Sequence, residues 1–395
     1  MTGTTSGEGA NGGQFHDPGP FTVEAQGQTL RFFPSGKARL GALLDLIGEA
    51  RTSLKVCFYI FAKDTSSTRV RDALVAAAAR GVKVTLIIDG FGADADDEFF
   101  APLKEAGGHY CRFSARWTHR YLIRNHQKMV VVDEKRAMIG GFNVEDAYFD
   151  PPEVNGWHDL ALIVEGSSVE RLSLWYDRLH AWTSNPKANW RAIRRMLREW
   201  DAGEEPVQLL VGGPTRGLSS WAACVRNDLM EGAKLDMVMA YFSPPRRLLK
   251  RIGRIACKGE TRLVMAAKSD NGATIGATRS LYSRLLKNDA RIWEFEPCKL
   301  HMKLIVLDDA VYLGSANFDM RSLYLNLELM LRIEDAGLAD RMREFVDLHL
   351  PASTEITPAR HLKRATIGNR IRWWASWFLV TVVDYTVSRR LNLGL

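Results

Sequence analysis

Two histidines and two lysines recur in this chain at matched spacing. The pattern His-x-Lys-x4-Asp occurs twice, 175 positions apart (301 − 126), in two sets of residues: His126, Lys128 and Asp133, and His301, Lys303 and Asp308. A turn of small residues with an asparagine follows each copy. Imidazoles can attack phosphorus or transfer protons, and ammonium groups can neutralise phosphate oxygens. The matched copies therefore indicate a duplicated unit in which each half contributes part of a centre for phosphodiester chemistry.

Each histidine precedes a segment with the composition of a buried strand. Residues 127–133 and 302–308 are apolar and rich in β-branched or aliphatic side chains. Because side chains alternate across a strand, the histidine and lysine of each copy point to the same face. Asp133 and Asp308 lie at the strand ends, where we expect them to hold a hairpin turn in place. A single His-x-Lys pair is also common at a strand end without function, and only the duplication favours the functional interpretation.

Helices and strands alternate ahead of each copy of the motif. The first half contains four expected elements, a helix at 38–48, a strand at 53–61, a helix at 69–81 and a strand at 82–89. The second half repeats this order at 218–233, 235–242, 247–258 and 261–266. Such alternation predicts an α/β fold with helices on both sides of a sheet. Two such halves facing across a pseudo-twofold axis would bring both histidines into one cleft.

We expect four regions along the 395 residues. They are a disordered tail at 1–20, a first domain at 21–200, a second domain at 201–352 and a basic C-terminal tail at 353–395. The first 20 residues lack the charged and apolar regions of a signal peptide, so none is expected. The five cysteines are odd in number and widely spaced, which favours core packing in a reducing cytoplasm over disulfides.

These motifs resemble those of the phospholipase D superfamily, and within it those of the bacterial cardiolipin synthases. The second copy, from His301 through Gly314-Ser315-Ala-Asn317 to Glu328, carries the closer resemblance. The first copy, from His126 to Trp157-His158-Asp159, is looser. The resemblance extends over about residues 28–350. It implies two tandem α/β/α domains related by a pseudo-twofold axis, with the active site at their interface.

The resemblance also implies a two-step displacement at phosphorus. In the superfamily the N-terminal histidine is usually the nucleophile, so His126 is expected to form a phosphohistidine, while His301 protonates the leaving alcohol and then activates the incoming alcohol or water. The sequence by itself leaves the order of the two histidines open. Positive charge on the lysines makes a metal or cofactor unnecessary, and none is expected. The groups expected to hold the non-bridging oxygens are the two lysines and the two turn asparagines: Lys128, Lys303, Asn143 and Asn317.

Each histidine needs an acceptor on its second ring nitrogen to fix its tautomer. Asp159 and Glu328 are the candidates, because they follow the histidines by 33 and 27 residues (159 − 126 and 328 − 301). By resemblance, Asp159 is expected to pair with His126 and Glu328 with His301.

The activity implied by the resemblance is phosphatidyl transfer between phosphatidylglycerol molecules, a step of phospholipid biosynthesis. Hydrolysis to phosphatidic acid would use the same residues with water as the acceptor. A nuclease of the same superfamily is a further alternative, although no nucleic-acid partner is expected. A catalytically inactive lipid-binding scaffold is disfavoured because both histidines, both lysines and both asparagines are present.

The formal net charge of +7 is concentrated near the end of the chain. Residues 360–390 hold seven lysines and arginines against one acid, Asp384, and they enclose an apolar, tryptophan-rich run at 373–383. Eleven residues are too few to cross a bilayer, which takes roughly 20. We expect this tail to associate with an anionic phosphatidylglycerol-containing membrane, peripherally on the cytoplasmic face of the inner membrane, with no obligate protein partner. The alternative is a helix packed on the protein core with solvated arginines.

A second arginine-rich segment, 189–200, has an apolar helical stripe with arginines beside it. Such a helix is the arrangement expected at an anionic surface, and a position packed against the protein core is the close alternative.

Overall fold

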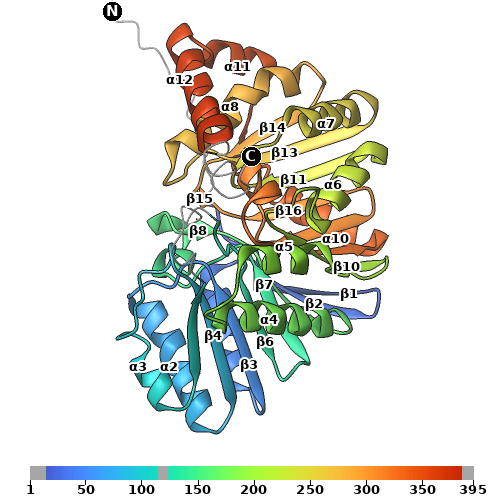
Figure 1. Ribbon diagram of the computed structural model, residues 1–395. Helices are drawn as coiled ribbons and strands as arrows, with labels where there is room; N and C mark the ends of the chain where they lie inside the picture. Colours follow the sequence, from blue (N-terminus) through green and yellow to red (C-terminus); the bar gives the residue numbers. More distant parts are fainter. Residues whose placement is uncertain (1–14, 114–122, 385–395) are drawn as a thin grey trace, which may run out of the picture.

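The computed structural model describes residues 15–113 and 123–384, which form two halves that meet along a broad contact (Figure 1). An eight-stranded mixed sheet forms the centre of each half. The first sheet has the order β1 (Phe21–Ala25), β2 (Gln28–Phe33), β9 (Ala161–Glu165), β7 (Arg136–Gly140), β6 (Met129–Val132), β3 (Ser53–Phe58), β4 (Lys83–Asp89) and β5 (His109–Phe113). The second has the order β10 (Val207–Gly212), β19 (Glu328–Glu334), β17 (Ala310–Gly314), β16 (Lys303–Leu307), β11 (Lys234–Met239), β13 (Glu260–Ala266), β14 (Arg291–Phe295) and β20 (Ser353–Glu355).

The two sheets repeat one topology. From β2 to β5 in the first sheet and from β10 to β14 in the second, corresponding strands follow in the same order. In both, three parallel strands join an antiparallel set through the strand that follows the motif histidine, β6 or β16. The duplication inferred from the spacing of the motifs is therefore a duplication of the whole fold, and the predicted α/β class is confirmed.

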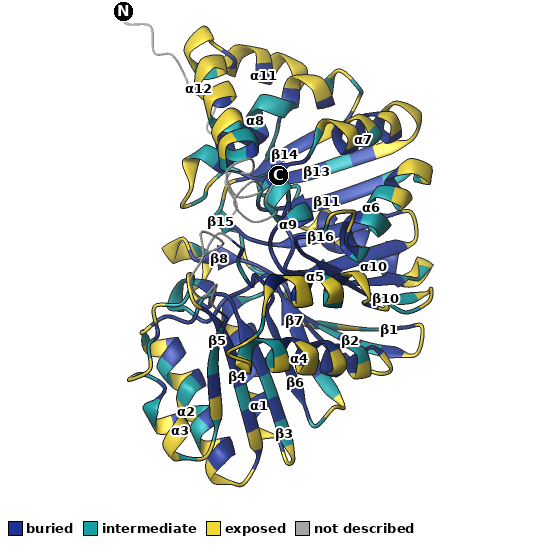
Figure 2. Cartoon of the chain, viewed as in Figure 1, coloured by how far each residue is buried: buried dark blue, intermediate teal, exposed yellow. Residues whose placement is uncertain are grey.

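Helices cover both faces of each sheet. The outer face of the first sheet packs against α1 (Gly36–Gly48), α2 (Thr65–Ala79) and α3 (Ala101–Glu105), and that of the second against α6 (Ser220–Glu231), α7 (Arg246–Lys258) and α8 (Gly272–Leu286). Between the sheets lie α4 (Ser168–Ser184), α5 (Trp190–Arg198) and α10 (Ala336–Asp347). Because the inner faces of both sheets contribute to one apolar cluster, the halves share a core (Figure 2).

The motif aspartates hold the hairpin turns. Asp133 and Asp308 adopt positive φ angles of 51° and 50° in the turns after β6 and β16. The Oδ1 atom of Asp133 accepts hydrogen bonds from the backbone amides of Thr52 and Ser53 at 2.7 and 2.9 Å. Asp308 accepts an equivalent bond from the amide of Lys234 at 2.8 Å. Each aspartate therefore fixes the start of the neighbouring strand, β3 or β11, away from the histidines.

The C-terminal segment is folded against the second half. β20 pairs with the edge strand β14, so the sheet extends past residue 352, where the tail was expected to begin. It is followed by α11 (Pro358–Arg364), α12 (Ile367–Trp377) and η3 (Phe378–Asp384), a wider helical segment that continues α12. Residues 1–14 of the expected N-terminal tail lie outside the described residues, but Phe15 packs edge-on against Phe295.

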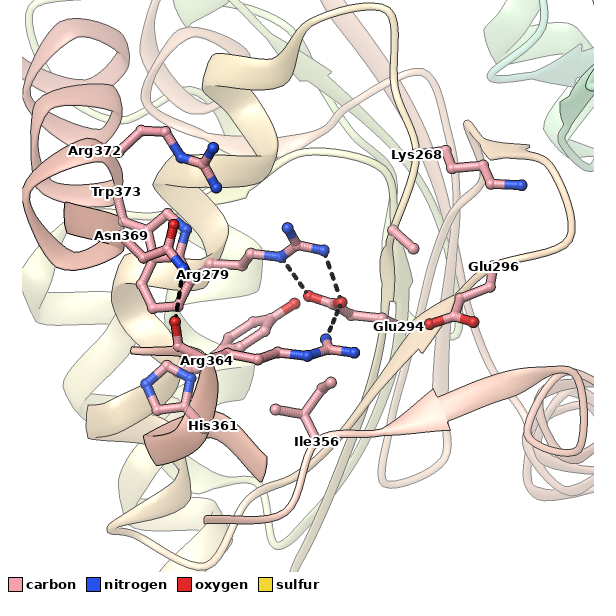
Figure 3. Close-up of a pocket in the computed structure, with 12 residues that line it drawn as sticks. Lys268, Arg279, Glu294, Glu296, Ile356, His361, Arg364, Asn369, Arg372 and Trp373 are labelled. Carbon is pink, nitrogen blue, oxygen red and sulfur yellow. Dashed lines mark hydrogen bonds and ion pairs between the residues drawn. The ribbon is translucent and has the colours of Figure 1, made fainter. Parts of the chain in front are cut away.

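A buried carboxylate anchors α11 (Figure 3). Glu294 of β14 is 1% exposed and accepts two hydrogen bonds from Arg279 of α8, at 2.7 and 2.8 Å, and one from Arg364 of α11 at 3.1 Å. On α12, Trp373 is buried and its ring stacks on His361. Part of the segment expected to meet a membrane is therefore protein core. Among the described residues, no helix combines the length and apolarity needed to cross a bilayer.

Candidate active site

Both motif histidines lie where the two halves meet, and each is held by the backbone of the opposite half. The amide of His126, just before β6, donates to the carbonyl of Leu327 at 2.9 Å. The amide of His301, just before β16, donates to the carbonyl of His158 at 2.8 Å. The short strands β8 (Trp157–His158) and β15 (Lys299–Leu300) pair in parallel across the same boundary. These backbone bonds bring the two half-sites together.

The carboxylates are exchanged between the halves. Nδ1 of His126 lies 3.0 Å from Oε2 of Glu328, and Nδ1 of His301 lies 2.7 Å from Oδ2 of Asp159. The pairing expected from the resemblance, Asp159 with His126 and Glu328 with His301, is therefore wrong. The cause is the backbone contact across the boundary, because the residue before each carboxylate binds the amide of the opposite histidine.

Each dyad leaves the second ring nitrogen, Nε2, available for chemistry. A carboxylate on Nδ1 fixes the tautomer that carries its proton on that nitrogen, so that the lone pair is on Nε2. The carboxylates are themselves positioned, since Glu328 accepts from the hydroxyl of Ser315 at 2.5 Å and Asp159 from the amide of Leu160 at 2.8 Å.

Gly141 lets the first half approach the second dyad. A Cβ at this position would lie 2.7 and 2.8 Å from the carboxylate oxygens of Asp159 and 2.9 Å from Cδ of Lys303. Any side chain here would displace one of these groups. The glycine of the first turn is therefore required by close packing around the His301 dyad.

The two lysines are buried beside the histidines. Nζ of Lys128 donates to the carbonyl of His126 at 2.6 Å, and Nζ of Lys303 donates to the carbonyl of His301. Burial lowers the pKa of Lys128 to about 7 and that of Lys303 to about 8. An anion bound between them would restore the charged forms, so the site is suited to a phosphate group.

The two dyads differ in charge. Burial raises the pKa of Glu328 to about 7. Burial also acts to raise the pKa of Asp159, but the hydrogen bond from His301 and the charge of Lys303 hold it below its usual value. Burial and the neighbouring lysines lower the pKa of both histidines, that of His301 to about 3. Both imidazoles are therefore neutral, that of His301 beside a firmly ionised carboxylate and that of His126 beside a carboxyl that titrates near neutrality.

The two turn asparagines are both buried. Oδ1 of Asn143 accepts from the amide of Ile60 at 3.1 Å, which orients its side chain. Oδ1 of Asn317 is buried without a hydrogen-bond partner among the described residues. All eight candidate catalytic residues are buried: His126, Lys128, Asn143, Asp159, His301, Lys303, Asn317 and Glu328.

Aromatic side chains that were not predicted as site residues complete the walls. Oη of Tyr148 lies 3.4 Å from Nε2 of His301, and the ring of Trp157 lies edge-on to the same imidazole at 5.1 Å between centroids. Beside the other dyad, the ring of Tyr59 lies 4.9 Å from the ring of His126, measured between centroids. Arg124 donates a hydrogen bond of 2.8 Å to the hydroxyl of Tyr59. Tyr148 has no tyrosine counterpart 175 positions later, so the duplication gave no signal for it.

Potential metal ligands gather elsewhere in the described part of the chain. His109, Cys111 and His180 place one ligand atom each within 4.8 Å of one another, between β5 and α4. They belong to neither dyad.

A duplicated α/β fold with two opposed His–carboxylate dyads and two buried lysines defines an enzyme of the phospholipase D superfamily. The family model described as "Cardiolipin synthase, PLD-like domain" matches residues 43–179 and 228–348, and the chain belongs to this family. The resemblance inferred from the motifs is confirmed.

Curated relatives cover most of the chain. Cardiolipin synthase 1 of Bacillus anthracis is 31% identical over 350 residues, which are 83% of this chain and 67% of the relative. The major cardiolipin synthase ClsA of Bacillus subtilis is 29% identical over 361 residues, 87% of this chain and 73% of the relative. The crystal structure of phosphatidylserine synthase from Haemophilus influenzae matches with a TM-score of 0.73 at 15% identity, covering 94% of this chain and 96% of that one. At this identity the structural match supports the fold alone.

Proposed function

We propose that this protein is a phosphatidyltransferase of the cardiolipin synthase type, which moves a phosphatidyl group from one phosphatidylglycerol to the hydroxyl of another. The observation that carries the proposal is the pair of opposed dyads, His126–Glu328 and His301–Asp159. Membership of the family and the likeness to cardiolipin synthases of several bacteria support the choice of substrate.

In the first step, Nε2 of His126 attacks the phosphorus of the donor lipid. The bond between phosphorus and the glycerol headgroup breaks, and protonated His301 gives its proton to the departing glycerol oxygen. The charge difference between the dyads supports these roles, because ionised Asp159 stabilises an imidazolium at His301. Besides burial, the charge of Lys303 lowers the pKa of His301, and the phosphodiester anion of a bound lipid would counter that charge.

In the second step, His301 removes the proton from a hydroxyl of the acceptor lipid. The acceptor oxygen attacks phosphorus, the phosphorus–nitrogen bond to His126 breaks, and cardiolipin is released. Positive charge from Lys128 and Lys303 stabilises the non-bridging oxygens in both steps. The amides of Asn143 and Asn317 are proposed to assist by hydrogen bonding.

We infer that the protein works at an anionic membrane surface, peripherally on the cytoplasmic face of the inner membrane. One face of α12 and η3 exposes five apolar side chains: Ile367 (80%), Ile371 (63%), Trp374 (60%), Phe378 (41%) and Leu379 (52%). Arg370 and Arg372 lie on the same helix, which complements a negative surface. The ion pair between Arg321 of α9 (Met320–Tyr324) and Asp384 of η3, at 2.9 Å, joins this surface to the chain that follows Asn317.

An end-product assay with purified protein and phosphatidylglycerol vesicles tests the proposal. With excess chelator present, we expect cardiolipin and glycerol in equal amounts. Phosphatidic acid as the main product would instead identify a hydrolase with water as acceptor. Absence of lipid turnover together with cleavage of single-stranded DNA would refute the lipid substrate and identify a nuclease.

A further inference from the structure

Three side chains with nitrogen or sulfur donors form a cluster at the edge of the first sheet, away from both dyads. His109 and Cys111 belong to the edge strand β5, and His180 belongs to α4. One donor atom of each residue lies within 4.8 Å of those of the other two. In the part of the chain that the structure describes, this edge cluster is the one group of histidines, cysteines and acids arranged to hold a metal ion.

The alternation of side chains along β5 turns its two donors toward α4. His109, Cys111 and Phe113 share one face of the strand, because they are two residues apart. Phe113 packs against Trp182 of α4 with ring centroids 5.2 Å apart, so this face is the one that the helix covers. His180 therefore meets the strand donors from the opposite side of the same contact.

The distance between the two imidazoles suits a tetrahedral metal ion. Nε2 of His180 lies 3.2 Å from Nδ1 of His109, and the ring planes are inclined at 76°. Zinc–nitrogen bonds of about 2.0–2.1 Å at tetrahedral angles place two nitrogen ligands about 3.3 Å apart. The nitrogens therefore need little adjustment to bind one ion together.

A hydrogen bond between the two imidazoles would also give this distance, but it does not account for the other donors. The hydroxyl of Ser184 lies 3.4 Å from the same Nε2 of His180 and forms a hydrogen bond with the thiol of Cys111. Residues four apart lie on one face of a helix, so α4 presents both His180 and Ser184 to the strand. Four donor groups thus converge from two elements, which a pair of hydrogen-bonded histidines would not require.

The types of donor indicate which metal fits. Two imidazoles and a thiol suit Zn²⁺, whereas Mg²⁺ and Ca²⁺ prefer oxygen ligands, and the edge cluster contains no carboxylate. His109 is exposed, and Cys111 and His180 are half-buried. An ion can therefore reach the donors from solvent.

We propose that the edge cluster binds one Zn²⁺ and that this ion fastens β5 to α4. The hydroxyl of Ser184 or a water molecule takes the fourth position, and binding releases the thiol proton of Cys111 to solvent. The ion takes no part in chemistry at phosphorus, because the cluster belongs to neither dyad.

The fastened elements are an edge and a support of the first half. Among the described strands, β5 pairs with β4 alone, so hydrogen bonds of the sheet hold it on one side. α4 supports the first motif, because Nε1 of Trp175 donates to the side chain of Gln127 at 2.9 Å. Gln127 stands between His126 and Lys128 in the chain. A bond from α4 to β5 through zinc would stabilise this side of the first sheet.

The first experiment measures zinc binding by the untagged full-length protein, kept reduced with a phosphine. Competition with a chromogenic chelator should give about one Zn²⁺ per chain. His109→Gln and Cys111→Ser should each weaken binding at least about tenfold, since loss of even an outer partner of a metal site costs that much. The controls His16→Gln and Cys257→Ser remove the same groups from exposed positions and should leave binding unchanged. Absence of binding, or equal effects of the two pairs of variants, would overturn the proposal.

Cobalt(II) in place of zinc reports whether the thiol is a ligand. A cobalt–thiolate bond gives a charge-transfer band in the near ultraviolet. This band should appear in the wild type and in Cys257→Ser and should be lost in Cys111→Ser, with circular dichroism to show that each variant is folded. Binding of one cobalt ion without the band would refute the ligand set.

Hydrogen exchange followed by mass spectrometry tests the fastening. Added Zn²⁺ should slow exchange of the β5 amides at least about threefold in the wild type and have no effect in His109→Gln. The edge strand of the second sheet, β20, is the internal control and should be unaffected. Zinc bound at one equivalent without slower exchange of β5 would contradict the proposed structural role. None of these measurements depends on which lipid the dyads act on.

Discussion

His126 of the first half and Glu328 of the second form a hydrogen bond of 3.0 Å across 202 residues of sequence. The reciprocal bond joins His301 to Asp159. Because each histidine takes its carboxylate from the opposite half, neither half contains a complete dyad. The orientation of both imidazoles is therefore a property of the interface between the halves.

The assignment of the nucleophile predicts a difference between the two histidine variants. His126→Ala should abolish the covalent phospho-enzyme, because no Nε2 remains to attack phosphorus. His301→Ala should still form the adduct from a donor with a good leaving group. Rapid quenching with a phosphorus-labelled short-chain lipid measures both. An adduct that persists in His126→Ala would move the nucleophile to His301.

The exchanged carboxylates predict which step each one supports. Asp159→Asn should slow expulsion of glycerol by about 10²–10⁴, because it no longer stabilises the His301 imidazolium. A p-nitrophenyl phosphodiester has a leaving group that needs no proton. With this substrate, the first step of Asp159→Asn should recover its rate. Glu328→Gln should not be restored in this way, since its effect is on the attacking His126. If each histidine instead paired with the carboxylate of its own half, the p-nitrophenyl substrate would restore the first step of Glu328→Gln and not that of Asp159→Asn. That result would contradict the exchange of carboxylates.

Lys303 should make stability depend on pH. Its folded-state pKa of about 8 lies below the usual 10.5, so the stability contributed by the neutral amine is present above about pH 10.5 and lost as the pH falls through about 8. Met binds no proton, so this loss does not occur in Lys303→Met. As the pH falls from about 10.5 to about 8, the free energy of unfolding of Lys303→Met should therefore rise by on the order of 3 kcal/mol relative to that of the wild type. Urea unfolding from pH 7 to 10 measures the difference. The exposed Lys250→Met is the control, and a difference for Lys303→Met that is flat in pH would exclude a buried ammonium.

The apolar face of α12 should be required for binding to vesicles and not for activity on a soluble substrate. Ile371→Glu places a charge at a position 63% exposed, and Met230→Glu does the same at a position 58% exposed on α6. We expect Ile371→Glu to weaken sedimentation with phosphatidylglycerol vesicles at least about fivefold, with activity on a short-chain soluble donor kept, and Met230→Glu to do neither. Point variants suit this question better than deletion of residues 365–395, which would also remove the buried Trp373. Equal losses on vesicles and soluble donor would assign the helix to the core alone.

Metal removal should leave turnover unchanged. Lys128 and Lys303 supply the positive charge of the proposed mechanism, and the cluster of His109, Cys111 and His180 lies outside the dyads. Dialysis against chelator followed by the cardiolipin assay, with and without added Zn²⁺ or Mg²⁺, checks this. If chelation abolished cardiolipin formation and a divalent ion restored it, the lysines would not be the source of the positive charge that stabilises the phosphate oxygens.

Local patterns in the sequence were sufficient for much of the site. The matched spacing of His126 and His301 predicted the duplicated fold, and alternation along a strand placed each lysine with its histidine. The exchange of Asp159 and Glu328 could not be predicted from spacing, because it is decided by backbone contacts such as the bridge between Asn125 and Leu327.

Amphipathic helices show a second limit of the sequence. The apolar stripe of α5 carries the same information whether it faces a membrane or a core, and only its tertiary partners decide. The C-terminal segment, for which both positions were considered, packs on the core only in part. Trp373 packs inward while the neighbouring Trp374 is 60% exposed.

The exchange of carboxylates has a consequence for biosynthesis of the enzyme itself. While the chain is being translated, His126 leaves the ribosome about two hundred residues before the glutamate that orients it. Until the second half has been made and has docked, the nascent chain holds a histidine without its partner. We therefore expect a chain truncated before the second half to lack activity, because it has neither the carboxylate that orients His126 nor the second histidine.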